Sequence, residues 1–226
     1  MKNFLLTSAL ALGLTSGLFA LPISIESSDT GGAATGAVFV NFDTLALGNA
    51  NQSVSGVNLS FTGNAKVVQG LVVNQYAPPF LSGDNGIGFG APDQVNGADA
   101  TRYLSAGTGS VSLAFESGQK YFGLLWGSVD TFNSLMFYDG MTLLGTFTGA
   151  DVIALANGNQ GLVGTTYVTF NSEVFFNKIV ATSTTNSFEF DNIAFDIKQR
   201  NVPDSASTVA LLGLGLVGLA ALRRKL

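Results

Sequence analysis

Between residues 21 and 201, large apolar residues alternate with small or polar ones, which is the pattern of half-buried β-strands. In residues 110–115, for example, single small residues separate Val111, Leu113 and Phe115. We also expect strands at residues 38–44, 57–62, 66–73, 121–129, 135–138, 143–148, 165–170, 178–182 and 188–197. Many short strands with turn residues between them predict an all-β domain.

The connections favour an antiparallel arrangement. Asp139 and Gly140 fit a two-residue hairpin turn, because glycine readily adopts the positive φ that such turns require. Only residues 151–156 have a helical pattern, with Asp151 as the expected N-cap and Gly158 near the end. The sequence therefore predicts an antiparallel β-sandwich, jelly-roll-like in type.

Both ends of the chain differ from this middle part. Residues 4–20 are apolar, follow Lys2 and end in Ala20, which predicts a signal peptide over residues 1–20, with an uncleaved anchor as the alternative. No Cys follows this segment, so the chain is not predicted to be a lipoprotein.

At the other end, residues 209–222 are apolar on every face, so a globular core would have to enclose such a helix completely. Arg223, Arg224 and Lys225 follow directly and resist translocation. This stop-transfer layout predicts a single transmembrane helix at about residues 205–222, with the basic end in the cytoplasm.

Just before the apolar span stand Val202, Pro203, Asp204 and Ser205. This motif, the apolar span and the three cations follow one another in the order found in PEP-CTERM sorting tails. The C-terminal segment therefore resembles that family, in the variant whose motif reads Val-Pro-Asp-Ser. Ala206 stands where that variant usually has Gly.

This resemblance implies an export route. In that family an exosortase, a membrane-embedded cysteine protease of the inner membrane, cuts near the motif and passes the protein to the surface of a Gram-negative bacterium that makes exopolysaccharide. The chain is then divided into the signal peptide, an ectodomain at residues 21–201 and a sorting segment at 202–226. The implied partners are an exosortase and exopolysaccharide, and the implied precursor is anchored in the inner membrane.

Charge and composition exclude several functions. Residues 21–201 hold six cations and 14 carboxylates, a net charge of −8, which excludes nucleic acid as a partner. The chain has neither His nor Cys. It therefore lacks histidine as the commonest general base of enzymes and cysteine as a thiol nucleophile. Glu189 and Asp191 match the first part of the Glu-x-Asp-x-x-Glu pattern of jelly-roll glycoside hydrolases, but Ala194 occupies the last Glu position. We therefore expect no enzymatic activity.

Aromatic residues are the candidates for ligand binding. Trp126 lies in residues 121–127, a run that is apolar on both faces and therefore predicts a central strand. Its ring could be a sugar-stacking platform, but the favoured interpretation is that it belongs to the core. Tyr76 and Phe80 belong to the long irregular stretch 74–100, where a binding loop and a plain surface loop are both consistent with the sequence.

A phase conflict marks residues 188–197. A regular strand there would place Glu189 and Asp191 on the same face as Ile193 and Phe195. The favoured interpretation is a β-bulge at Asp191 and Asn192 that turns both side chains to backbone donors or solvent, so that no metal is needed. The alternative is a bound Ca²⁺ with Asp191 as a ligand. The carboxylates of stretch 74–100, namely Asp84, Asp93 and Asp99, do not have the spacing of an EF-hand loop.

The sequence thus predicts an exported cell-surface or matrix protein with a structural or adhesive role and no cofactor. The alternative function is a carbohydrate-binding module on the same jelly-roll fold.

Overall fold

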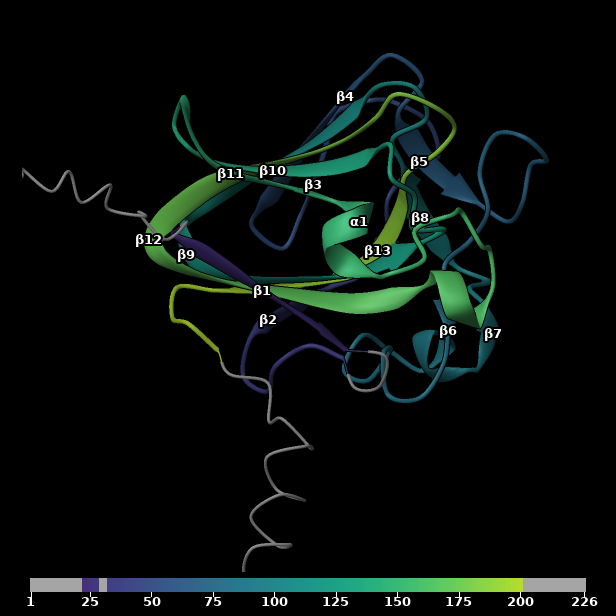
Figure 1. Ribbon diagram of the computed structural model, residues 1–226, viewed down its shortest axis with the longest axis horizontal. Coiled ribbons are helices and arrows are strands. Elements are labelled where there is room, and N and C mark those ends of the chain that lie inside the picture. The colour runs from purple at the N-terminus through teal and green to yellow at the C-terminus, as the bar shows by residue number, and fades with distance from the viewer. Residues whose placement is uncertain (1–21, 29–31, 201–226) are drawn as a thin grey trace, which may run out of the picture.

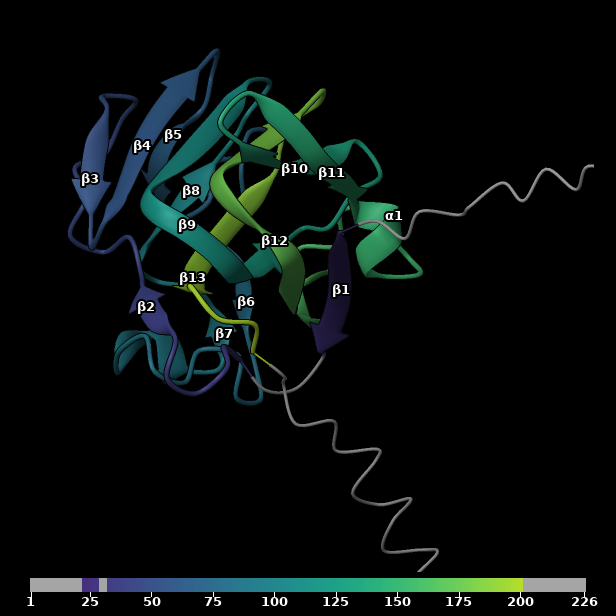
Figure 2. The ribbon, with the colours of Figure 1, turned by 90° about the vertical axis from the view of Figure 1, so that its left-hand side faces the viewer.

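Two long antiparallel strands form the centre of the fold. The computed structural model describes residues 22–28 and 32–200, and within them β9 (Ser110–Gly127) pairs with β12 (Thr166–Ser183). Both strands curve from one layer of the sandwich into the other (Figures 1 and 2). The pairing register is interrupted between Asn171 and Phe176, where the two strands bend.

The other strands extend outward from this pair. On one side, β12 is followed by β10 (Asn133–Asp139) and β11 (Thr142–Thr148). On the other, β9 is followed by β13 (Glu189–Asp196), β8 (Arg102–Ser105) and β5 (Lys66–Gln69).

Six shorter strands and three short helices complete the described part of the chain. They are β1 (Ile23–Ser28) on β12, β2 (Val38–Val40) on β13, β3 (Gln52–Val54) on β4, β4 (Val57–Thr62) on β9, the separate pair β6 (Phe80–Leu81) and β7 (Gly97–Ala98), η1 (Pro92–Gln94), α1 (Gly149–Val152) and η2 (Leu162–Gly164). The strand pairings are antiparallel, which confirms the predicted all-β antiparallel sandwich.

Aromatic rings fill the space between the layers. The ring centroid of Phe137 lies 4.9 Å from that of Phe170 and 5.2 Å from that of Phe176. Phe115 and Phe195 make a similar contact at 5.0 Å. Such edge-on and tilted pairs stabilise a core beyond the area they bury. Packing of this kind supports a domain of this size without disulfides.

The C-terminal half of β9 is buried on both faces. Phe122 and Leu124 belong to the main core, whereas Tyr121 and Leu125 belong to a second cluster on the opposite side. This follows from the alternation of side chains along a strand. The prediction that the run 121–127 is a central strand is therefore confirmed.

Some predicted boundaries were wrong. The runs 110–115 and 121–129 belong to one strand, β9, which ends at Gly127. Between the runs, Gly118 permits a close approach to β12, since a Cβ there would lie 3.0 Å from the Cβ of Phe175. The runs 165–170 and 178–182 likewise merge into β12.

The predicted helix and hairpin are both present but shifted. The helix α1 begins at Gly149, so its N-cap is Thr148 and not Asp151. Asp151 is the third residue of the helix, and its carboxylate accepts a hydrogen bond of 2.7 Å from the Thr148 N–H. The hairpin joins β10 to β11, but Asp139 still pairs with Thr142. Its connection is therefore one residue further on, with Gly140 at φ 57°.

Candidate functional site

Trp126 belongs to the core. Its side chain is fully buried, and its ring stacks on that of Phe188 with centroids 4.3 Å apart and planes at 16°. A sugar-stacking ring must present one face to solvent, and neither face of Trp126 does so. The interpretation of Trp126 as a ligand platform was wrong, and the core interpretation is confirmed.

Tyr76, by contrast, lines a hollow of about 620 Å³. The half-buried ring packs edge-on against Tyr103 at 6.3 Å, and the Lys66 Nζ lies 5.1 Å from its centroid. The amide side chains of Asn49, Asn64, Gln75 and Asn186 also line the hollow. An aromatic face surrounded by amides suits a polyhydroxylated ligand, because it combines an apolar surface with many donors and acceptors.

Phe80 does not join Tyr76 at this hollow. It is half-buried in β6, and its N–H donates to the Thr165 Oγ1 at 3.2 Å. Of the three aromatic candidates, the structure places only Tyr76 at a cavity.

The β-bulge predicted at Asp191 and Asn192 is confirmed within β13. The register of β13 against β9 shifts between Asp191 and Ala194, and Asn192 has a φ of 50°. The bulge brings Phe190, Ile193 and Phe195 into the main core together, which resolves the phase conflict of the sequence.

The expected consequence of the bulge was wrong. Asp191 and Asn192 do not reach solvent, since both are fully buried, and neither oxygen of the Asp191 carboxylate has a hydrogen-bond partner. Burial, with the nearby carboxylates of Asp99 and Asp93, raises the pKa of Asp191 well above its ordinary value.

Two further carboxylates lie beside Asp191. Asp93 comes from η1 and Asp99 follows β7, and one oxygen from each of the three residues lies within 4.8 Å of the other two. Burial raises the pKa of Asp93 to about 6 despite a hydrogen bond from Asn41. Sequence reasoning named Asp93 and Asp99 but did not connect them with Asp191. The available signal was charge: no Lys or Arg stands between Lys66 and Arg102 to neutralise them.

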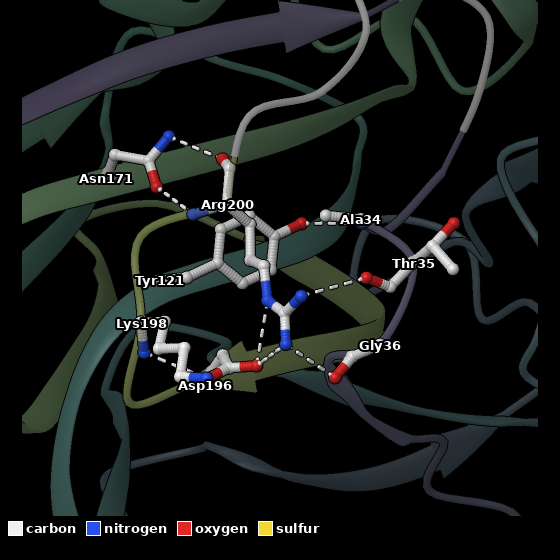
Figure 3. A network of polar contacts seen from close by, with 8 residues as sticks. All are labelled: Ala34, Thr35, Gly36, Tyr121, Asn171, Asp196, Lys198 and Arg200. Carbon is white, nitrogen blue, oxygen red and sulfur yellow. Dashed lines mark hydrogen bonds and ion pairs between the residues drawn. The ribbon is translucent and has the colours of Figure 1, made fainter.

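Arg200 fixes the C-terminal end of the described chain to the sandwich (Figure 3). Its guanidinium donates to Asp196 and to the carbonyls of Thr35 and Gly36, and its backbone exchanges two hydrogen bonds with the Asn171 side chain, of 2.8 and 2.9 Å. The folded domain is therefore pinned at the residue just before the C-terminal segment.

The ion pair between Arg200 and Asp196 predicts a pH-dependent stability. Burial alone would raise the pKa of Asp196, but hydrogen bonds from Arg200 and the Lys198 N–H outweigh it and lower that pKa. A lowered folded-state pKa stabilises the fold above the unfolded-state pKa, and this contribution is lost as the pH falls through the folded-state pKa. We expect Asp196→Asn to cost about 1 kcal/mol at neutral pH and progressively less as the pH falls below about 3.9, the ordinary pKa of an Asp side chain.

Urea unfolding of wild type and variant across this pH range measures the difference. The matched control is Asp84→Asn, which changes an exposed carboxylate of a surface loop. A wild-type advantage that is the same at both ends of the range would contradict the assignment.

Several predicted elements lie outside the described residues. They are the signal peptide at 1–20, the membrane helix at about 205–222, the motif residues Val202, Pro203, Asp204 and Ser205, and the cations Arg223, Arg224 and Lys225. Over residues 22–28 and 32–200, the helices are all too short to cross a bilayer.

Comparisons with known proteins give a result for this C-terminal segment. A search of curated proteins finds no match. The family model described as the VPDSG-CTERM motif matches residues 201–226, which include Val202, Pro203, Asp204 and the basic end. The motif indicates a secreted precursor that transits the membrane and is sorted to the cell surface by an exosortase-type enzyme. Residues 201–226 of this chain carry a VPDSG-CTERM motif, a variant of the PEP-CTERM type of sorting signal.

Proposed function

We propose that this protein is a structural or adhesive component of the cell surface or extracellular matrix, that it associates with exopolysaccharide and that it has no catalytic activity. The observation that carries this proposal is the sorting motif at residues 201–226, directly after a single β-sandwich domain. Its precursor is held in the inner membrane by the C-terminal helix until an exosortase removes the tail.

The domain has features that suit such a role. Its cohesion comes from a continuous aromatic core, and Arg200 ties the end of the domain to two distant segments. A load applied at the C-terminal end of the domain would therefore act on a point that is fixed to several segments of the fold. A passive surface component needs a stable fold more than it needs catalytic groups.

Gene deletion tests the proposal. Cells without the protein should show weaker cohesion and retain less exopolysaccharide, and the full-length gene should restore both. A chain truncated after residue 200 should restore neither, because it lacks the sorting segment. Normal cohesion and normal exopolysaccharide retention in the deletion strain would contradict the proposal.

The second candidate function is carbohydrate binding through the hollow at Tyr76. It rests on the aromatic face and amide side chains that this cavity gathers. In this case the domain would hold polysaccharide itself, by stacking a sugar ring on Tyr76.

We expect Tyr76→Ala to weaken retention of the full chain on the cells' own polysaccharide by about 30-fold, as loss of an aromatic anchor worth roughly 2 kcal/mol implies. Affinity electrophoresis in gels containing the polysaccharide measures this effect. The matched control is Phe175→Ala, which removes an exposed ring with the Lys120 Nζ 5.0 Å from its centroid, away from the hollow. Equal retention of both variants would exclude the hollow as a binding site.

A further inference from the structure

The three buried carboxylates of Asp93, Asp99 and Asp191 come from segments that are far apart in the chain. The first two belong to the irregular stretch 74–100, whereas the third is in the bulge of β13. All three residues are at most 2% exposed. The cluster therefore lies at the point where the long loop stretch meets the central sheet.

Nothing in the described part of the chain neutralises this cluster. There, the one ion pair joins Arg200 to Asp196, so no ammonium or guanidinium is paired with the three acids. Asp43 adds a fourth carboxylate close by, since the Asn41 Nδ2 donates to both Asp43 and Asp93 at 3.1 Å. Several carboxylates held together in a dry interior repel one another and destabilise the fold unless protons or a cation compensate.

The hydrogen bonds around the cluster leave specific oxygens free. One oxygen of Asp99 accepts from the Thr101 N–H and hydroxyl at 2.7 and 2.6 Å, and the other has no partner. Both oxygens of Asp191 are also without a partner. The surrounding donors thus hold the Asp99 carboxylate in place but leave three carboxylate oxygens without a hydrogen bond. Free oxygens of this kind are available to bind a ligand.

Asn192 gives an independent indication. Its amide side chain is fully buried, its N–H group faces Asp93 and helps to hold down the pKa of that carboxyl, and its oxygen has no hydrogen-bond partner. An unpartnered buried amide oxygen costs about 1–3 kcal/mol. The residue also has a φ of 50°, a left-handed conformation that asparagine adopts more readily than most residues and that places it in the bulge. Its amide oxygen is a neutral ligand of the kind that accompanies carboxylates around calcium.

We propose that Asp93, Asp99 and Asp191 bind one Ca²⁺ ion, with the amide oxygen of Asn192 as a further ligand. Two oxygens that share an ion at about 2.4 Å are at most about 4.8 Å apart, which is the limit within which the three carboxylate oxygens lie. Oxygen ligands alone favour a hard cation over zinc. Mg²⁺ usually keeps several waters and takes only one or two carboxylates, so three buried ones favour Ca²⁺.

The ion would clip the loop stretch 74–100 to the bulged strand. It would neutralise the cluster and hold η1 and the segment after β7 on β13. The Ca²⁺ proposal rests on the described domain alone and is independent of the proposed surface function.

Thermal unfolding of the full chain in nonionic detergent tests the site. Millimolar CaCl₂ in place of EDTA should raise the Tm by roughly 5–10 °C if the ion is about a hundredfold above its Kd. Calorimetric titration should give about one ion per chain. An unchanged Tm, or an equal rise with MgCl₂, would overturn the proposal.

Substitutions separate loss of the ion from loss of the fold. Asp191→Asn should abolish the response to CaCl₂, and in EDTA it should melt at or above the wild-type Tm because it removes a buried carboxyl group whose ionisation is penalised. The control is Asp84→Asn, an exposed carboxylate of the same stretch, which should respond as the wild type does. A wild-type response to CaCl₂ in the Asp191→Asn variant would overturn the assignment.

Discussion

Substitution of Pro203 or Asp204 by alanine should leave the protein uncut in the inner membrane and remove it from the cell surface. Both residues lie in the segment that matches the VPDSG-CTERM motif. Proline disfavours a helix both at its own position and at the residue before it, so we expect an extended, accessible chain just before the proposed membrane helix. Without that motif the exosortase would lose its recognition site, and the apolar span would keep the precursor in the bilayer.

Fractionation of cells followed by quantitative immunoblotting measures this effect. Lys198→Ala is the matched control, because it changes an exposed residue of the described domain just outside the matched segment. This control should be processed like the wild type. Normal amounts of surface protein in the Asp204→Ala strain would contradict a role for the motif in sorting.

Trp126→Ala should lower the free energy of unfolding by about 3–5 kcal/mol. The indole is fully buried and stacks on Phe188, so its removal leaves a large cavity between strands that cannot close. Total stabilities of single domains are about 5–15 kcal/mol, and the variant therefore loses a large share of its stability. Urea unfolding of the exported protein, followed by tyrosine fluorescence, measures the difference.

The control for this prediction is Phe175→Ala, which removes a ring that is 50% exposed. It should change the free energy of unfolding by less than about 1 kcal/mol. If Trp126→Ala were equally mild, the assignment of Trp126 to the core would be wrong.

The strand content of this fold could be predicted because the hydrophobic pattern is local. Alternation identified residues 110–115, and the apolar run 121–127 identified the strand that is buried on both faces. The joining of these runs could not be predicted, since Gly118 and its neighbours suit a turn as well as a bend. Gly118 packs closely against Phe175 of the partner strand in the folded chain, and this tertiary contact cannot be read from the local pattern.

The short strands and the ends of strands were also not predicted correctly. The pair β6 and β7 is made of two residues each, and the Phe80–Ala98 pairing joins parts of a stretch that has no alternation of its own. Similarly, the predicted strands at 38–44 and 66–73 extend only over β2 and β5. Tertiary pairing sets such limits, and local propensity does not contain that information.

The candidate sites, too, could be predicted only where the signal is local. The phase conflict at Asp191 could be predicted, because period-two alternation fails visibly there. The proximity of Asp191 to Asp93 and Asp99 could not be predicted, since those two residues are more than ninety positions earlier and do not have the spacing of a calcium-binding loop. The core position of Trp126 was correctly favoured, because its run is apolar on both faces. Tyr76 and Phe80 could not be told apart from sequence, because aromatic residues serve cores and ligand sites equally well.

The most direct test of the central claim is the intact mass of the wild-type protein collected from the surface of its producing cells. If the VPDSG-CTERM segment is a sorting signal, the mass should correspond to a chain that ends near the motif and lacks Arg223, Arg224 and Lys225. A surface protein whose mass still includes Arg223 would contradict exosortase processing and, with it, the proposed route to the cell surface.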